Sequence, residues 1–261
     1  MAYISPTLTL IIGAVKKTAS ALGRDFNELE HLQNSVHPDK GFAQHSYEKV
    51  QKILREELSK IKAGLPIVTS NKETASATGS YFAVCPIDGF ANFAHGNADF
   101  AVSVALIEEN KVMSAAVYSP ITDEMFFAEK GCGAFKEGFR NHERLRVASC
   151  KNADKALFAC SADSKIINNT LNLTRNLRIS GVSSLDLAYL AAGKIDAAAV
   201  TTAHISEIAA GVLLVKEAGG YVFEIGQTDV RSENLDKTLA SGNLFATNEA
   251  LKQKIADVLA K

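Results

Sequence analysis

The sequence predicts a protein of mixed helices and strands, with an α+β lobe followed by an α/β lobe. Three patterns support this prediction. Apolar residues recur at helical spacing in the first sixty residues, apolar and small residues alternate between residues 100 and 128, and helices alternate with strands in the second half. The pattern changes near residues 146–152 without a flexible linker. We therefore expect lobes at 1–146 and 147–261 that pack as one compact unit.

Two helices are expected at the N-terminal end. In the first, the apolar residues of segment 8–22 fall on one face, and Gly41 is expected to mark a break after the helix. In the second, at 47–61, apolar residues form one stripe while lysine, arginine and glutamate occupy the remaining positions. The polar segment 69–80 that follows is typical of a loop or hairpin.

Short strands with alternating patterns come next. The expected strands are 81–84, 100–106, 112–118 and 124–128. A turn at 108–110 joins the second and third of them, and Gly131-Cys-Gly133 is expected to form a hairpin or bulge after the last. Because consecutive strands with short connections pair with one another, this region predicts an antiparallel meander.

The second half contains helices with recognisable end signals. The expected elements are helices at 183–192 and 206–218, a strand at 221–225 and a helix at 249–260. Ser183 or Ser184 is expected to cap the first of these helices, and Gly193 to occupy the C′ position after it. Ser206 is expected to cap the second helix, which ends before two glycines.

Composition excludes several functional classes. The chain of 261 residues has 28 basic and 29 acidic residues, and the resulting net charge of −1 argues against a dominant nucleic-acid-binding surface. No apolar run approaches the roughly 18–20 residues of a membrane span, and no signal peptide is expected. The four cysteines form no C-x-x-C pair, which argues against a disulfide scaffold and a structural zinc site. We expect a protein of the reducing cytoplasm.

The densest group of chemically active residues lies in segment 85–93. An apolar strand ends there in Pro86, followed by Asp88 and Gly89. Such a strand end can direct a carboxylate into a cleft while the next N–H groups point at an anion. The alternative interpretation is an ordinary turn after a strand. Cys85 is a candidate nucleophile, but an inert, half-buried thiol is the alternative, because no base is identifiable near it.

A second candidate group begins at His204. Glu207 lies in the first turn of the predicted helix, where an acid interacts favourably with the helix dipole. The alternative interpretation is that this acid has no role beyond the helix terminus, and that His204 is a surface or capping residue. None of the six histidines has the spacing of a zinc motif.

Taken together, these segments resemble the inositol monophosphatase family over nearly the whole chain. Cys85-Pro-Ile-Asp-Gly-Phe-Ala-Asn-Phe93 resembles the family signature D-P-[IL]-D-G-T-x-N-F. The segment from Gly181 to Gly193 resembles G-[ST]-A-A-L-D-L-A-Y-V-A-A-G, and segment 207–220 resembles D-[IM]-A-A-G…V-x-E-A-G-G. Arg24-Asp-Phe26 is similar to the corresponding segment of bacterial members.

The resemblance implies a layered α-β-α-β-α sandwich, commonly dimeric. It also implies hydrolysis of small phosphate monoesters, such as inositol monophosphate, by three Mg²⁺ ions that acidic side chains hold. From it we expect a homodimer and a small phosphorylated ligand, with no membrane and no nucleic-acid partner.

Residue by residue, the resemblance implies a depleted metal site. It places metal ligands at Asp88, at Glu207 and at the backbone carbonyl of Ile87, while Cys85 stands where the family has a metal-bridging aspartate. It further implies that Gly89, the N–H of Phe90 and Ser183 contact the phosphate or the substrate.

Other family positions carry residues of a different chemistry. Phe90 stands where the family has the threonine that helps to activate water, and Thr69 stands where it has a glutamate. Tyr47 replaces an aspartate, and Val200 replaces the glutamate that touches the substrate hydroxyls.

Because Mg²⁺ prefers several oxygen ligands, these replacements predict a member whose catalysis is impaired or absent. One alternative is an active phosphatase with a reduced metal site that uses Asp88 and Glu207, with Glu73 or His204 as a further ligand. Another is a thiol-based or soft-metal site at Cys85.

Overall fold

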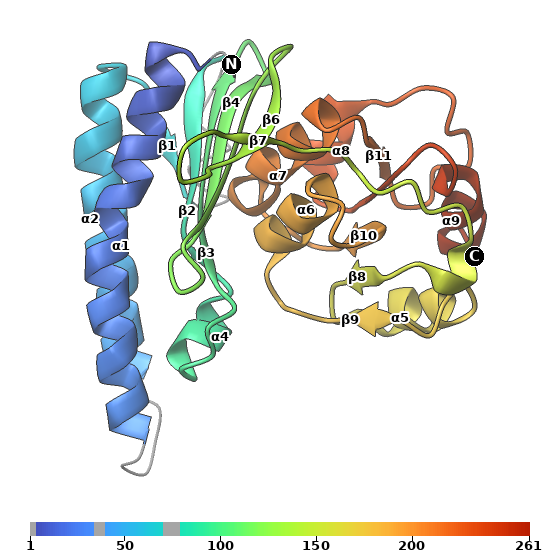
Figure 1. Cartoon of the computed structure of the whole chain (residues 1–261), viewed down its shortest axis with the longest axis horizontal. Coiled ribbons are helices and arrows are strands. Elements are labelled where there is room, and N and C mark those ends of the chain that lie inside the picture. The colour runs from blue at the N-terminus through green and yellow to red at the C-terminus, as the bar shows by residue number, and fades with distance from the viewer. Residues whose placement is uncertain (1–3, 34–39, 70–78) are drawn as a thin grey trace.

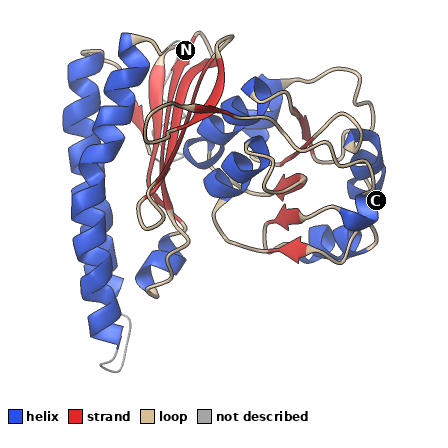
Figure 2. Ribbon diagram, in the orientation of Figure 1, coloured by secondary structure: helices blue, strands red, loops and turns tan. Residues whose placement is uncertain are grey.

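The computed structural model describes residues 4–33, 40–69 and 79–261, and it consists of five stacked layers (Figure 1). A pair of long helices covers the outer face of a seven-stranded sheet. Two helices separate this sheet from a five-stranded sheet, and further helices cover the outer face of the second sheet (Figure 2). The α-β-α-β-α sandwich that the resemblance implied is confirmed.

The outer helix pair consists of α1 (Pro6–Gln33) and α2 (Lys40–Ile61). Their apolar faces are buried against the first sheet, as the periodicity predicted. The expected break at Gly41 is wrong, because Gly41 lies in the first turn of α2. Gly41 is the second residue of α2, outside the helix interior where a glycine costs about 1 kcal/mol.

The first sheet runs in sequence order from β1 to β7. Its strands are β1 (Ile67–Val68), β2 (Tyr81–Asp88), β3 (Ala101–Glu108), β4 (Lys111–Ser119), β5 (Glu124–Glu129), β6 (Gly133–Lys136) and β7 (Glu143–Arg144). All neighbours pair antiparallel except β1 and β2, so the predicted meander is confirmed. Residues 70–78, most of the expected loop or hairpin, lie outside the described residues.

The middle layer contains α6 (Ser183–Ala191) and α7 (Ile205–Glu217). The two helices approach closely at Gly211, where a Cβ atom would lie only 2.5 Å from the Cβ of Leu187. Helix α7 contacts β2 to β6 of the first sheet, and α6 also contacts β10 and β12 of the second sheet. Because both helices are sandwiched between sheets, nearly all their residues are buried.

The second sheet has the strand order β11-β12-β10-β8-β9. Its strands are β8 (Phe158–Cys160), β9 (Leu177–Arg178), β10 (Ala197–Val200), β11 (Tyr221–Glu224) and β12 (Leu244–Thr247). The outer layer contains α5 (Ser164–Leu171) and α9 (Lys252–Leu259), while α8 (Leu235–Ser241) lies beside α7 and β11. Of these elements, only β11 and the last helix were expected. The first sheet ends at Arg144 and the second begins at Phe158, while the division into lobes stays a prediction.

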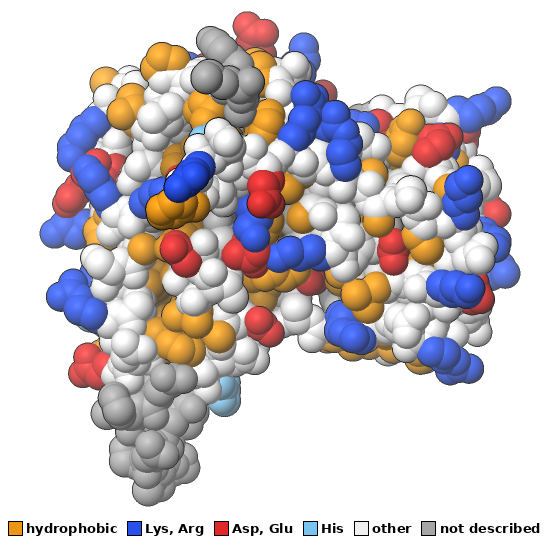
Figure 3. Space-filling model, viewed as in Figure 1, with side chains coloured by type: hydrophobic (Ala, Val, Ile, Leu, Met, Phe, Trp, Pro, Cys, Tyr) orange, Lys and Arg blue, Asp and Glu red, His pale blue; other side chains and the backbone are white. Residues whose placement is uncertain are grey.

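Charged side chains of both signs are interspersed on the face shown in Figure 3. Among the described residues, no helix is both long enough and apolar enough to cross a membrane.

Candidate functional site

The candidate site begins with a bulge near the end of β2. Cys85 pairs with Ser103 and Asp88 pairs with Ala101, so three steps along β2 match two steps along β3. The extra residue changes the alternation of the side chains, which places Cys85 and Asp88 on the same face of the sheet. Pro86 lies within this bulge, where its missing N–H group costs no ladder hydrogen bond.

Glu207 reaches the same place from the first turn of α7. Its Oε2 atom accepts a hydrogen bond from the His204 N–H at 2.9 Å, and His204 Nδ1 accepts one from the Ser206 N–H at 3.3 Å. These bonds form a capping box, which holds the Glu207 side chain in position. The expectation that Ser206 caps this helix is wrong, because His204 precedes the helix in an extended conformation and supplies the cap.

Three potential ligand atoms converge as a result. One atom each from Cys85, Asp88 and Glu207 lies within 4.8 Å of the other two. Both Cys85 and Asp88 are buried, and Glu207 is half-buried. In the part of the chain that the structure describes, this is the only group of three such residues. Below, we call these three residues the thiol–carboxylate cluster.

Ser184, at the start of α6, binds the carboxylate of Asp88. Its N–H and its hydroxyl both donate to Asp88 Oδ2, at 2.7 and 2.5 Å. The pKa of Asp88 is raised to about 7: burial is the largest cause and the charge of Glu207 acts in the same direction, while the Ser184 bonds lower the pKa. Burial and the two acids likewise raise the pKa of the Cys85 thiol well above its usual value. Asp88 is therefore partly protonated at neutral pH.

Ser184 was expected only as a cap. Neither Ser183 nor Ser184 supplies the side-chain cap of α6, since the N-cap position is Val182 and no side-chain hydrogen bond is made there. Ser184 donates instead to an acid far away in the sequence, which a rule based on neighbouring residues cannot detect. Ser183 is the first residue of α6, and its role as a substrate contact stays a prediction.

A second buried acid, Asp186, lies two residues beyond Ser184 in α6. Ser180 Oγ donates to both of its carboxylate oxygens at 2.9 Å. Burial raises the pKa of Asp186 to about 7, and the charges of Asp88 and Asp99 contribute in the same direction. The resemblance assigned no role to this residue.

Two family positions are occupied by rings that touch each other. Tyr47 of α2 and Phe90, the first residue of α4 (Phe90–Ala94), pack edge to face with ring centroids 6.1 Å apart. Thr69 lies beside α2, where its Oγ1 accepts a hydrogen bond from the side chain of Gln51 at 2.9 Å. Where the resemblance places an aspartate and a water-activating threonine, this chain has a half-buried aromatic pair.

The backbone around Asp88 retains a conformation that requires glycine. Gly89 has a φ of 80°, and a Cβ there would lie 2.7 Å from Val182 Cγ2 and 3.0 Å from the carbonyl oxygen of Asp99.

The Ile87 side chain is buried toward α1 and α2. Val200 is buried at the end of β10, and Glu73 lies outside the described residues.

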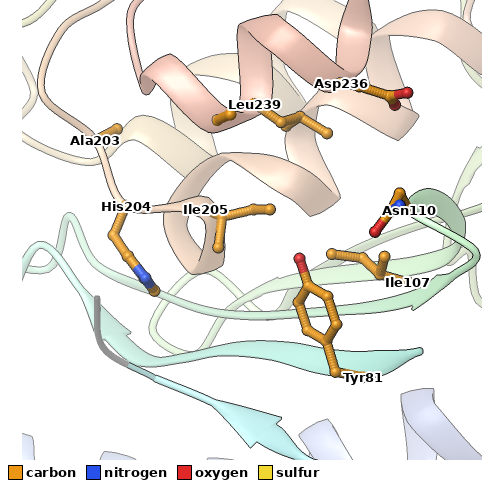
Figure 4. Close-up of a pocket in the computed structure, with 9 residues that line it drawn as sticks. Tyr81, Ile107, Asn110, Ala203, His204, Ile205, Asp236 and Leu239 are labelled. Atoms are coloured by element: carbon orange, nitrogen blue, oxygen red, sulfur yellow. The ribbon is translucent and has the colours of Figure 1, made fainter. Parts of the chain in front are cut away.

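A separate pocket of about 340 Å³ lies between the first sheet and the starts of α7 and α8 (Figure 4). Tyr81 and Ile107 line it from the sheet, His204 and Ile205 line it from α7, and Asp236 is at its edge. His204 is thus the link between this pocket and the thiol–carboxylate cluster, since its backbone N–H binds Glu207.

The donor set of the cluster does not suit the Mg²⁺ ions that the resemblance implies. Mg²⁺ needs near-octahedral oxygen ligands, and a thiol is a poor ligand for it. Of the three donors in the cluster, Cys85 supplies sulfur instead of oxygen. One oxygen of Asp88 already accepts two hydrogen bonds from Ser184, so the cluster offers Mg²⁺ few oxygen ligands.

Comparison with known proteins agrees with the fold and with the sequence pattern. The model of the inositol monophosphatase family matches residues 5–261. The chain is similar to the inositol-1-monophosphatase of Rhizobium meliloti, with 32% identity over 98% of this chain and 96% of that protein. It is also similar to the Nus factor SuhB of Escherichia coli, with 26% identity over 91% of each protein.

A solved structure, the extragenic suppressor protein suhB of Bartonella henselae, matches with a TM-score of 0.83. The two sequences are 29% identical, and the match covers 98% of this chain and 99% of that one. The chain therefore belongs to the inositol monophosphatase family.

Proposed function

We propose that this chain is a family member that binds a small phosphorylated ligand but no longer hydrolyses phosphate monoesters with Mg²⁺. The observation that carries the proposal is the contact between Tyr47 and Phe90, at positions where the resemblance implies an aspartate and a threonine. Both rings pack on the apolar core under α1 and α2. They offer no carboxylate to a cation, and Phe90 offers no hydroxyl to orient an attacking water.

The size of the expected loss follows from the number of groups replaced. Removal of one group that stabilises a transition state typically costs about 10²–10³ in rate. Such losses are not additive, but replacement at Cys85, Phe90, Tyr47 and Thr69 affects the metal ligands and the water together. We therefore expect no useful turnover, although the fold is intact.

Ligand binding is supported by the helix starts around Asp88. Helices α6 and α7 both begin at the thiol–carboxylate cluster, where Ser184 and Glu207 lie in their first turns. Helix N-termini favour anions through the helix dipole, although the N–H groups of Ser184 and Ser206 are bonded to Asp88 and His204. The left-handed turn at Gly89 also leads into the N–H of Phe90, which the resemblance implies as a phosphate contact.

A second candidate function is hydrolysis at a reduced metal site. The convergence of Asp88 and Glu207 favours it, because two carboxylates can hold one cation. This alternative predicts stoichiometric Mg²⁺ binding that disappears when Asp88 is replaced by alanine.

We further propose that the protein acts as a homodimer in the cytoplasm. Family resemblance supports the dimer, and four free thiols are compatible with a reducing compartment. The name Nus factor, which the Escherichia coli relative carries, supports a role as a protein factor as an alternative to catalysis.

The test measures phosphate release from inositol monophosphate at millimolar Mg²⁺, together with calorimetric binding of the same compound. We expect binding without turnover. Turnover of about 1 s⁻¹, within the usual range of enzymes, would overturn the proposal. The matched variant replaces Cys85 by aspartate and Phe90 by threonine, and a rise in phosphate release in this variant identifies the replaced residues as the cause of the loss.

A further inference from the structure

The thiol–carboxylate cluster has the ligand chemistry of a different kind of cation site. We propose that Cys85, Asp88 and Glu207 bind a thiophilic divalent cation of the Zn²⁺ class instead of Mg²⁺. Zn²⁺ accepts cysteine sulfur and carboxylate oxygen in one tetrahedral site, whereas soft donors disfavour Mg²⁺. Because the three donors come from a strand, its bulge and a helix start, the fold itself brings them together.

Both carboxylates are oriented by hydrogen bonds from neighbouring residues. Asp88 is held at Oδ2 by Ser184 and also bonds to the Gly89 N–H, and Glu207 is held at Oε2 by the His204 N–H. Among the described residues, Ser184 is the only one whose side chain donates to Asp88, and no side chain donates to Glu207. Outer hydrogen bonds of this kind orient ligands in known metal sites.

Ser103 provides an independent indication that the cluster takes a ligand. Its side chain is completely buried, and its Oγ has no hydrogen-bond partner within the described part of the chain. Ser103 is directly opposite Cys85 in the β2–β3 ladder, so both side chains point from the same face, with Cβ atoms about 5 Å apart. An unsatisfied buried hydroxyl costs about 1–3 kcal/mol. A metal-bound thiolate or water would give it an acceptor.

Loading the site releases protons as the cation binds. A coordinated thiol and a coordinated carboxylate are both deprotonated, so the Cys85 proton, and the Asp88 proton where it is present, leave to solvent as the metal–ligand bonds form. Ligand atoms around a tetrahedral Zn²⁺ lie about 3–4 Å apart, so the present separation of up to 4.8 Å requires only a small contraction of side chains. Three protein ligands leave the fourth position to water or to an anion.

This inference is independent of the proposed loss of hydrolysis, because it concerns which cation binds and not what the site does afterwards. Phosphate release tests the function, and metal binding tests the inference. A chain that hydrolyses phosphate esters yet binds Cd²⁺ through Cys85 would contradict only the proposed function.

The experiment titrates the full chain, freed of metal by a chelator, with Cd²⁺ and Zn²⁺. We expect one Cd²⁺ per chain, with the ultraviolet charge-transfer band of a cadmium–thiolate bond, and a matching calorimetric isotherm for Zn²⁺. Cys85→Ser should abolish the band and weaken Zn²⁺ binding at least about tenfold. The matched control is Cys132→Ser, which removes a half-buried thiol outside the cluster and should leave both signals unchanged.

Glu207→Gln is the second variant, because glutamine preserves the capping box while it removes the charge. It should weaken Zn²⁺ binding with little change in the unfolding midpoint. The inference is overturned if Zn²⁺ does not bind, if the band survives in Cys85→Ser, or if Mg²⁺ binds more tightly than Zn²⁺.

Discussion

Replacement of Asp186 by asparagine should make the stability of the protein less dependent on pH. Asp186 is buried, and its pKa is raised to about 7 from a reference value of 3.8, chiefly by burial. Because the folded state holds this proton more tightly than the unfolded state, the stabilising contribution is complete below about pH 4. It is lost as the pH rises to about 7.

The magnitude follows from the size of the shift. About three pKa units at 1.36 kcal/mol each correspond to about 4 kcal/mol that ionisation of Asp186 costs the folded state. Between about pH 4.5 and 6.5, Asp186→Asn should therefore reduce the slope of unfolding free energy against pH by about 1.4 kcal/mol per pH unit. Asparagine can still accept the hydrogen bond from Ser180. Asp88, whose pKa is also raised to about 7, should keep part of the slope.

The assay is urea unfolding at four pH values from about 4.5 to 8, followed by circular dichroism. The control is Asp257→Asn, which removes an exposed acid of α9 and should leave the slope unchanged. An identical slope in wild type and Asp186→Asn would refute the reasoning, because it would mean that Asp186 is ionised in the folded state at little cost.

Two further predictions concern the residues around Asp88. Gly89→Ala should lower the free energy of unfolding by about 1–3 kcal/mol in urea, because its backbone is left-handed and the added Cβ meets Val182; an unchanged midpoint would contradict the close contact. A double-mutant cycle of Tyr47→Ala and Phe90→Ala should give a coupling of about 0.5–1.5 kcal/mol, as expected for an edge-to-face pair. Additive losses would show that the rings do not stabilise each other.

Local signals predicted the C-terminal ends of α6 and α7 and the first sheet well, but not the residues that cap the starts of these helices. Gly193 and Gly219 both have positive φ, as expected for residues that end helices. The meander was predictable because its strands alternate small and large residues and are joined by short turns. The break was expected at Gly41, but α1 ends at Gln33 and α2 has already begun at Lys40, so Gly41 lies in the first turn of the second helix.

The second sheet was mostly missed for a physical reason. Strands β8, β10 and β12 are three or four residues long and buried at every position. A strand covered on both faces has no alternation of polar and apolar residues, and Ala197–Val200 is dominated by alanine, which favours strands weakly. Periodicity therefore contains no signal for them.

The candidate site was predictable in its members but not in its assembly. Family resemblance pointed to Asp88 and Glu207, while the bond from Ser184 joins positions 96 residues apart and leaves no local pattern. Pro86 was the available signal for the bulge, because proline inside a strand is confined to edges and bulges. Without that bulge, Cys85 and Asp88 would face opposite sides of the sheet.

The way in which the replaced residues pack supports the proposed change of the site. Tyr47 and Phe90 lie on different elements, yet their rings meet in a favourable edge-to-face geometry. Independent replacements of an aspartate and a threonine by random residues would leave cavities or unpaired polar groups, each costing a few kcal/mol. Here Tyr47 and Phe90 pack against each other, while Cys85 lies directly opposite Ser103, whose hydroxyl has no hydrogen-bond partner among the described residues. That division of the site into an apolar half and a sulfur-containing half supports the proposed change of ligand chemistry.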